Sequence, residues 1–308
     1  MSSCAAPKVG LVALYGLALL LTGGCSTTGV DRSASHSSGP RPLGSLRRAL
    51  TFHASFDGST DADFAAGDPW LYQAPDLDHR LDARPGLPDD GSVSLEVAGG
   101  RHGGALYFVK RTTPVAFYRG AGNLAWRAST WSGTVSFWLR VDPRALPMGF
   151  CDPVNITPRS WDDGAFFVEF ERRTNDAPFR LGAYPDRKIW NPQGRVWAEM
   201  SASEKPILAV DQPPFTADRW IHVVFTWENF NTGRNNGTTH LSIDGIEVGS
   251  ITARTQTFTW DPAETRILLG VGFEGWLDDL AVFSRALTQT EIRRIRDLPH
   301  GIRSLYSP

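Results

Sequence analysis

Between about residue 49 and residue 283, hydrophobic and polar positions alternate in short runs that are separated by Gly, Pro, Asn and Asp. Clear alternating runs lie at residues 50–56, 105–109 and 134–141. The run at 220–227 carries β-branched and aromatic residues on both faces, as expected of a central strand packed on each side. Regular strands with turn signals and no long helical period predict an antiparallel, all-β sandwich.

One segment, Leu241 to Val248, predicts a hairpin. Its Asp-Gly link favours a type I′ turn, in which glycine accepts the positive φ that the strand twist requires. Such a turn pairs Ile243 with Ile246 and Leu241 with Val248. We therefore expect these four side chains to lie on one face of the sheet.

A short C-terminal helix is predicted after Thr288. This threonine and Glu291, three residues later, form the pattern of a capping box. Leu287 and Ile292 stand at the two positions of a hydrophobic staple around the same helix start. The helix should run to about residue 297, because a proline follows at residue 299.

The N-terminus resembles an export signal of bacterial lipoproteins. Lys8 precedes the apolar run Val9–Leu21, which would form a helix of about 20 Å at 1.5 Å per residue. That length is too short to span a bilayer and is typical of a signal peptide, here residues 1–24. The following residues resemble a lipobox ending at Cys25, although Thr22 stands where leucine is usual. The resemblance implies lipidation of Cys25 and anchoring in the cell envelope, at the outer membrane or surface where the host has one. Plain secretion is the alternative.

The rest of the chain divides into a tether, one domain and a tail. Residues 25–48 are assigned to the tether, since Ser, Thr, Gly and Pro predominate from Ser26 to about Pro42 and cannot bury apolar surface. The predicted domain is 49–297 and the tail is 298–308. Within the domain, residues 57–91 and 142–212 are rich in Pro, Asp and Gly, so we expect long loops there with a few extra strands.

Composition removes several function classes. The formal net charge is −2, and no basic stripe interleaved with aromatic residues occurs, which argues against nucleic-acid binding. Of the three cysteines, Cys4 would leave with the signal and Cys25 would take the lipid. Cys151 would then be alone, so no disulfide is expected in the mature chain. Its Pro/Asp context favours a loop thiol over a buried side chain.

Several segments, in their order along the chain, resemble the laminin-G-like domains of bacterial surface and secreted proteins. The resemblance covers residues 49–297 and implies a two-sheet jelly-roll β-sandwich of the concanavalin A-like lectin/glucanase type with a short C-terminal helix. This fold serves lectins, hydrolases, lyases and adhesion modules, so it does not specify a function. The matching segments are Phe56-Asp57-Gly58, Gly104-Ala105-Leu106-Tyr107-Phe108, Thr134-Val135-Ser136-Phe137-Trp138-Leu139-Arg140, Trp220-Ile221-His222-Val223-Val224-Phe225-Thr226-Trp227, Leu241-Ser242-Ile243-Asp244-Gly245 and Gly275-Trp276-Leu277-Asp278-Asp279-Leu280-Ala281-Val282-Phe283.

The resemblance also implies a structural calcium ion, because domains of this kind often bind one. Carboxylate oxygens are the hard ligands that Ca²⁺ prefers, and Asp57 opens an acidic loop that also holds Asp61, Asp63 and Asp68. The last strand of such sandwiches lies near the first, so Asp278 or Asp279 could complete the set, and Asp57 with Asp278 is the expected pair of ligands. The alternative is that these aspartates only stabilise turns.

Catalytic patterns are weak. Glu169 and Glu171 should lie on one face of a strand, as a glycosidase pair would, but the third acid of the Glu-x-Asp-x-x-Glu strand is missing. Exposed alternating charge on a strand is the commoner explanation of the pair. His222 is interpreted as a hydrogen-bonded core histidine. The sequence shows no nucleophile motif or phosphate-binding glycine loop, so we do not expect an enzyme.

Tryptophan carries the most functional information. Trp161-Asp162, Trp190-Asn191 and Trp197 lie in polar, loop-like stretches, where exposed aromatic faces could stack on sugar rings while Asp and Asn bind the hydroxyls. The alternative is a satellite core under a long loop. The sequence predicts a non-catalytic module on the envelope that binds carbohydrate. A structural or adhesion module with a protein partner is the second hypothesis, and a glycoside hydrolase or polysaccharide lyase is the third.

Overall fold

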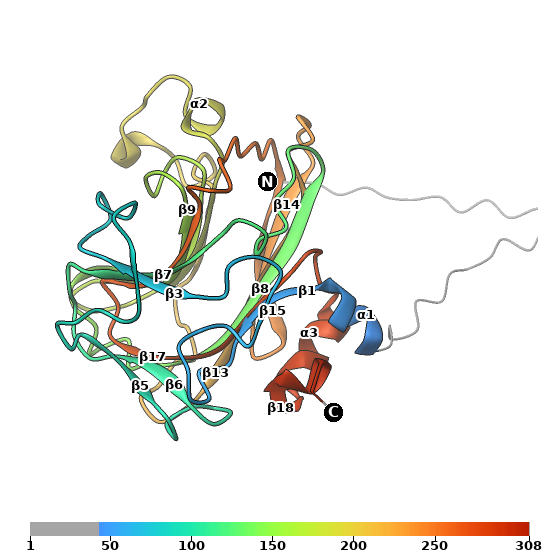
Figure 1. Ribbon diagram of the computed structural model, residues 1–308. Helices are drawn as coiled ribbons and strands as arrows, with labels where there is room; N and C mark the ends of the chain where they lie inside the picture. Colours follow the sequence, from blue (N-terminus) through green and yellow to red (C-terminus); the bar gives the residue numbers. More distant parts are fainter. Residues whose placement is uncertain (1–42, 308) are drawn as a thin grey trace, which may run out of the picture. The chain divides into compact units, whose positions relative to one another are not determined.

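The computed structural model describes residues 43–307, which form two antiparallel sheets packed face to face with short helices outside them (Figure 1). Sheet A has the order β15-β14-β13-β8-β17-β1-β2, with β6 on β17 and β5 on β6; sheet B has the order β12-β11-β10-β9-β16-β7-β3-β4. This is the predicted jelly-roll sandwich. The strands of sheet A are β15 (Ile246–Arg254), β14 (Gly237–Ile243), β13 (Ile221–Phe230), β8 (Trp131–Arg140), β17 (Gly275–Phe283), β1 (Leu50–Ala54), β2 (Phe64–Ala65), β6 (Ala105–Phe108) and β5 (Val93–Glu96).

Sheet B is built largely from the region that the sequence assigns to long loops with a few strands. Four of its eight strands, β9 to β12, lie in residues 142–212. Its strands are β12 (Ile207–Val210), β11 (Phe179–Tyr184), β10 (Ala165–Arg172), β9 (Gly149–Thr157), β16 (Arg266–Val271), β7 (Val115–Arg119), β3 (Leu71–Ala74) and β4 (Arg84–Pro85). The helical elements and the last strand are α1 (Leu43–Ala49), α2 (Arg187–Trp190), η1 (Trp197–Glu199), α3 (Gln289–Arg296), β18 (Pro299–Ile302) and η2 (Arg303–Leu305).

The main core lies between the two sheets and is centred on aromatic residues. Trp131 of β8 is buried, and its ring centroid lies 5.0 Å from those of both Trp227 and Trp260. Phe166 of β10 reaches the same cluster from sheet B, 5.7 Å from Trp131. Trp260 follows β15 in a stretch next to Asp261 and Pro262, and its side chain is buried in this core.

A second apolar cluster covers the outer face of sheet A. Helix α1, helix α3, β18 and η2 lie together there (Figure 1) and bury Leu46, Ile292 and Ile295 against Val224 of β13. Since Phe225 of the same strand points into the main core, β13 is packed on both faces, as predicted. The capping box of α3 is confirmed.

The structure differs from the predicted domain bounds at both ends. Residues 43–48, assigned to the tether, form most of α1, and residues 298–307, assigned to a tail, include β18 and η2. Both segments are held because they bury apolar side chains on α3. The predicted signal peptide, Cys25 and the tether up to residue 42 lie outside the described residues. None of the helices within residues 43–307 is long and apolar enough to cross a membrane.

The predicted hairpin forms with one change in register. Ile243 pairs with Ile246 across the Asp244-Gly245 turn, where both central residues have positive φ (49° and 74°). A register shift then pairs Leu241 with Gly249 instead of Val248. The expectation of one shared apolar face is therefore wrong, and Ile246 is 67% exposed.

Cys151 is also placed differently from the prediction. It lies in β9 with a fully buried side chain, in the core between the sheets. Burial raises the pKa of its thiol to about 12, so the thiolate that would make it reactive is scarce at neutral pH. The loop-thiol interpretation is wrong because proline and aspartate occur here within a strand.

Candidate functional site

The three loop tryptophans singled out in the sequence lie together on the outer face of sheet B. Trp161, Trp190 and Trp197 surround Tyr184, the last residue of β11, with ring centroids 5.5, 5.2 and 5.9 Å from the tyrosine ring. We call these four residues the aromatic cluster. Alternation along β11 places Tyr184 on the outer face, because Ala183 before it points into the core.

The cluster is partly a satellite core and partly an open surface. Tyr184 is buried, Trp190 and Trp197 are half-buried, and Trp161 is 49% exposed. The Lys205 ammonium lies 4.5 Å from the centre of the Trp197 ring, a cation–π arrangement. Both sequence interpretations therefore hold in part: buried rings support an exposed one.

The two polar residues predicted beside the tryptophans maintain the loop. The backbone carbonyl of Asp162 accepts a hydrogen bond from the Trp190 indole (2.8 Å), and its carboxylate binds the Arg187 guanidinium. The Asn191 side chain bonds both the backbone N–H and the carbonyl of Arg195 (2.9 and 3.0 Å). Asn191 is therefore occupied in closing a turn, whereas the Asp162 carboxylate lies near the surface.

Sequence reasoning missed Tyr184 and Lys205. Tyr184 has a recognisable signal, since it ends an alternating run just before a proline. Its buried hydroxyl has no hydrogen-bond partner among the described residues. Lys205 comes from the loop before β12, and only the tertiary structure brings it to Trp197.

A buried charged group lies further along the same face of sheet B. Glu169 of β10 is paired in register with Arg180 of β11, and this arginine binds both Glu169 and Glu171 (2.6 Å to Glu171 Oε2). Asp152 of the neighbouring strand β9 accepts a hydrogen bond from Asn155 (2.8 Å). Glu169 and Glu171 thus share a face, as predicted, but one guanidinium holds both.

Two of these carboxyl groups have strongly perturbed pKa values. Burial, reinforced by the nearby Asp152 carboxylate and opposed by Arg180, raises the pKa of Glu169 to about 8. Burial also raises the pKa of Asp152 to about 6. Such values are found in catalytic acids, yet Glu169 is only 4% exposed and Asp152 only 8%. A substrate oxygen therefore has little access to either group.

His222 is a core histidine, as predicted. Its Nε2 lies 2.9 Å from the Ser136 hydroxyl, and burial lowers its pKa to about 3, so the ring is neutral at physiological pH. It lies beneath Trp138 on sheet A, with ring centroids 4.9 Å apart.

The predicted calcium ligands bind the same loop. Asp278 of β17 is buried, and its Oδ2 accepts the backbone N–H groups of Arg101 and His102 (2.7 and 3.0 Å). Asp57 Oδ1 accepts the N–H of Gly104 (2.9 Å), while its Oδ2 lies 3.2 Å from Arg303. The structure thus brings together the two aspartates that the resemblance selected.

The Asp278 carboxylate has one buried oxygen that is available to a ligand. Its Oδ1 is buried without a partner in the described chain, and burial together with Asp279 and Asp57 raises its pKa to about 8. A Cβ at Gly103 would lie 2.1 Å from Asp57 Oδ1, so the loop can approach these acids only with glycine there. Within residues 43–307, no three or more His, Cys, Asp or Glu side chains lie close enough together to hold a metal ion. Further ligands would therefore be backbone carbonyls or water.

The other acidic residues of the loop after β1 have structural partners. The Asp61 carboxylate accepts the backbone N–H of Leu71 (3.0 Å), and Asp63 accepts that of Ser55 (2.9 Å) while it pairs with Arg303. Asp68 accepts the Tyr72 hydroxyl (2.9 Å). For these three, the turn-stabilising alternative describes the observed role.

The sequence matches the Laminin_G_3 family model, which describes the concanavalin A-like lectin/glucanases superfamily, over residues 118–293. The match covers more than half of the chain, so this protein belongs to that family. No curated protein matches the sequence.

Two toxin binding domains of known structure show the same fold at low identity. The botulinum neurotoxin serotype D binding domain has a TM-score of 0.54 at 13% identity, and covers 83% of this chain and 52% of its own. The binding domain of Paraclostridial Mosquitocidal Protein 1 has a TM-score of 0.51 at 13% identity, with 82% and 52% covered. Domain 4 of a GH43 arabinanase from Geobacillus stearothermophilus, in complex with arabinotriose, has a TM-score of 0.49 at 17% identity, with 80% and 97% covered. The chain spans about half the length of the two toxin structures.

Proposed function

We propose that this protein is a non-catalytic carbohydrate-binding module displayed on the cell envelope. The observation that carries the proposal is the aromatic cluster, in which an exposed Trp161 ring packs edge to face against the buried Tyr184 ring and the half-buried Trp197 ring. Aromatic faces stack on the apolar faces of sugar rings, and a rigid ring loses little freedom when it binds. Lys205 beside Trp197 supplies a donor for hydroxyl groups, and Asp162, which also binds Arg187, supplies an acceptor from the loop between β9 and β10.

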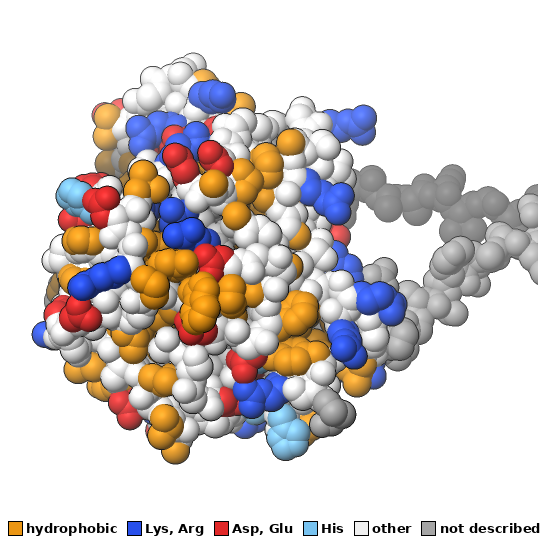
Figure 2. Space-filling view, in the orientation of Figure 1, with side chains coloured by type: hydrophobic (Ala, Val, Ile, Leu, Met, Phe, Trp, Pro, Cys, Tyr) orange, Lys and Arg blue, Asp and Glu red, His pale blue; other side chains and the backbone are white. Residues whose placement is uncertain are grey.

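The charge of the surface agrees with a neutral or weakly charged partner. Figure 2 shows Lys and Arg side chains interspersed with Asp and Glu over the visible face, in keeping with the net charge of −2. Nucleic acid would require a one-signed basic surface.

The enzyme hypothesis has one observation in its favour, the raised pKa values of Glu169 and Asp152. A glycosidase also needs both carboxyl groups to reach the glycosidic bond from its two sides. Here Arg180 binds Glu169, and both acids are buried, so binding without hydrolysis is the better account. A protein partner is the other alternative. The glycan array described next bears on it, because a protein that binds no glycan would favour a protein partner.

The proposal is tested by screening the full-length protein on a glycan array and comparing Trp161→Ala with Trp70→Ala. Trp70 is a matched control because it is 52% exposed and precedes β3, near the opposite edge of sheet B. We expect Trp161→Ala to weaken glycan binding at least about tenfold, equivalent to about 1.4 kcal/mol, and Trp70→Ala to leave it unchanged.

Absence of glycan binding by the unmodified protein would contradict the proposal, as would equal effects of the two substitutions. A glycan that is released in cleaved form would favour the hydrolase instead. Both variants should melt at the temperature of the unmodified protein, since each removes an exposed side chain.

We further propose that Cys25 is lipidated and that it anchors the protein to the envelope. The support is the order of Lys8, the apolar run Val9–Leu21 and Cys25. Expressed in a bacterial host, the unmodified protein should remain with the membrane fraction, and Cys25→Ser should move to the soluble exported fraction. Equal distribution of the two proteins would contradict the anchor and leave plain secretion.

We also propose that Asp57 and Asp278 hold a structural Ca²⁺. The unpartnered Oδ1 of Asp278 and the glycine-lined loop support it. A bound ion would neutralise two carboxylates and tie β1, β17 and the loop 97–104 together.

A further inference from the structure

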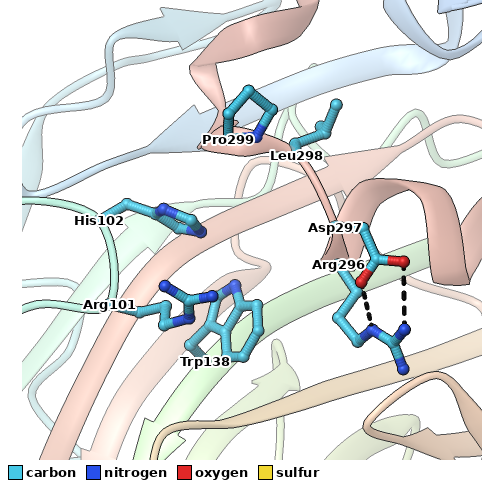
Figure 3. A pocket seen from close by; sticks show the side chains of 7 residues that line it. All are labelled: Arg101, His102, Trp138, Arg296, Asp297, Leu298 and Pro299. Carbon is cyan, nitrogen blue, oxygen red and sulfur yellow. Dashed lines mark hydrogen bonds and ion pairs between the residues drawn. The ribbon is translucent and has the colours of Figure 1, made fainter.

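A cavity of about 360 Å³ opens on the outer face of sheet A, away from the aromatic cluster. One wall is the β5–β6 connection (97–104), which contributes Arg101 and His102. The opposite wall is the C-terminal end of α3, which contributes Arg296 and its C-cap Asp297. Trp138 of β8 lies at the base. Figure 3 shows the side chains of Arg101 and His102 directed towards the space between the two walls.

The two arginines differ in their pairing. Arg296 is neutralised by Asp297, with Nε–Oδ1 and Nη2–Oδ2 distances of 2.7 and 3.1 Å, and it also donates to the carbonyl of Asp244. The Arg101 guanidinium lies 5.0 Å from the centre of the Trp138 ring and makes no ion pair within residues 43–307. The cavity therefore holds one arginine that forms no ion pair with a carboxylate of the described chain, beside a second arginine that does.

His102 adds a neutral polar group beside this charge. Its ring meets Trp138 edge to face at 5.9 Å, and its Nε2 is shielded from solvent without a hydrogen-bond partner in the described chain. Burial lowers the pKa of His102, which favours the neutral ring. A neutral imidazole can donate or accept one hydrogen bond to an occupant of the cavity.

The loop that carries Arg101 is held in position by Asp278 and Trp138. The backbone N–H groups of Arg101 and His102 both bind the buried Asp278 carboxylate. The Arg101 side chain also rests on Trp138, so its guanidinium loses little freedom when an anion binds. Arg101 is exposed to solvent, but its position is set by the Trp138 contact and by the Asp278 bonds to its backbone.

We propose that this cavity binds the carboxylate of an acidic sugar unit, a uronate. The planar guanidinium of Arg101 matches a carboxylate with two parallel hydrogen bonds. The volume is near the lower limit of ligand pockets, which suits one sugar ring. The choice of a sugar as the carrier of the carboxylate rests on the proposed function, whereas the preference for an anion rests only on this cavity.

The test compares D-glucuronic acid with D-glucose, which differ at one carbon by a carboxylate in place of a hydroxymethyl group. Ligand-observed NMR titrations of the full-length protein should give at least tenfold tighter binding of glucuronate. Arg101→Met keeps the aliphatic stem on Trp138 and removes the charge, and it should weaken glucuronate binding at least tenfold. Arg234→Met is the matched control: Arg234 is exposed in the β13–β14 turn, at the Trp131 end of β8.

Three results would overturn the inference: equal binding of the two sugars, full glucuronate affinity in Arg101→Met, or the same loss in Arg234→Met. Binding of phosphatidylglycerol vesicles in place of glucuronate would overturn it too, by assigning the charge to a lipid surface. An unchanged melting temperature of Arg101→Met separates loss of binding from loss of fold.

Trp161→Ala separates this inference from the proposed function. It should leave glucuronate binding intact, because Trp161 lies on sheet B and the cavity on sheet A. If neutral glycans do not bind on the array but glucuronate binds through Arg101, the aromatic cluster is excluded as a glycan-binding site and the cavity is retained as a carboxylate-binding site. If the array succeeds and Arg101→Met has no effect, the cavity is excluded.

Discussion

Glu169 and Asp152 show how a strand surface can hold acids away from water. The two lie on adjacent strands of sheet B, and Arg180 and Asn155 satisfy part of their hydrogen-bonding capacity. Burial disfavours the ionised forms of both groups, and the Asp152 carboxylate further disfavours ionisation of Glu169. The pair therefore binds protons more tightly in the folded chain than in the unfolded one.

This linkage predicts a pH-dependent stability. The folded-state pKa values of about 6 and 8 lie above the unfolded values of about 4. The contribution of the pair is thus complete below about pH 4 and is lost as the pH rises through the folded-state values. Each extra bound proton makes the free energy of unfolding fall by about 1.4 kcal/mol per pH unit. We expect Glu169→Gln to flatten this fall between pH 5 and pH 8 in urea titrations.

Glu171→Gln is the control for this experiment. Glu171 is on the same strand face and shares Arg180, but its replacement leaves both Glu169 and Asp152 in place. It should therefore keep the slope of the unmodified protein. Identical slopes for Glu169→Gln and the unmodified protein would contradict the linkage.

At the scale of elements, helix α3 is the piece that closes the outer side of sheet A. Thr288 Oγ1 accepts the N–H of Glu291 (3.3 Å), and the Glu291 carboxylate accepts the N–H of Thr288 (3.0 Å). The same carboxylate forms two bonds to Arg285, at 2.7 and 2.8 Å. The helix start is therefore fixed by local bonds, while Ile292 and Ile295 bind it to α1 and β13.

Thr288→Ala should lower the free energy of unfolding by about 1 kcal/mol, because the N–H of Glu291 loses its acceptor. Chemical denaturation measures the change. Thr290→Ala, two residues later and exposed on the same helix, should stay within about 0.5 kcal/mol of the unmodified protein. Equal effects of the two substitutions would mean that the cap does not contribute.

At the scale of the whole molecule, the loop 97–104 links the proposed calcium site to the cavity on sheet A. Asp278 holds the backbone of this loop, and the side chains of Arg101 and His102 point from it into the cavity. An ion at Asp57 and Asp278 would therefore order the wall of the anion site. Ligand binding and metal binding should support each other.

Added calcium should raise the melting temperature, and a chelator should lower it. At a free concentration one hundred times the Kd, a ligand of the folded state adds about 2.7 kcal/mol. Asp278→Asn should abolish the response, since an amide cannot supply the anionic ligand, whereas Asp211→Asn at an exposed position should preserve it. Calorimetry that shows no calcium-dependent shift in the unmodified protein would contradict the site.

Local signals predicted much of the architecture because they depend on neighbours in sequence. The capping box of α3 and the Asp244-Gly245 turn are each contained within a few residues, and the alternation along β8 and β13 reports burial directly. The bulge opposite Leu241 has no such signal, since it depends on how β15 lies against its neighbour. The prediction for Cys151 is wrong for the same reason, because the flanking Pro and Asp residues describe the local chain and not what packs over it.

The sequence by itself determined the class of fold, the elements that local chemistry specifies, and the residue types available for binding. It also selected Trp161, Trp190 and Trp197, but not whether they meet. Only the tertiary structure brought them to Tyr184, paired Glu169 with Arg180, and placed Arg101 across a cavity from Arg296. These contacts join residues far apart in the chain, and they follow from the order of strands in the sheets, which no local pattern encodes.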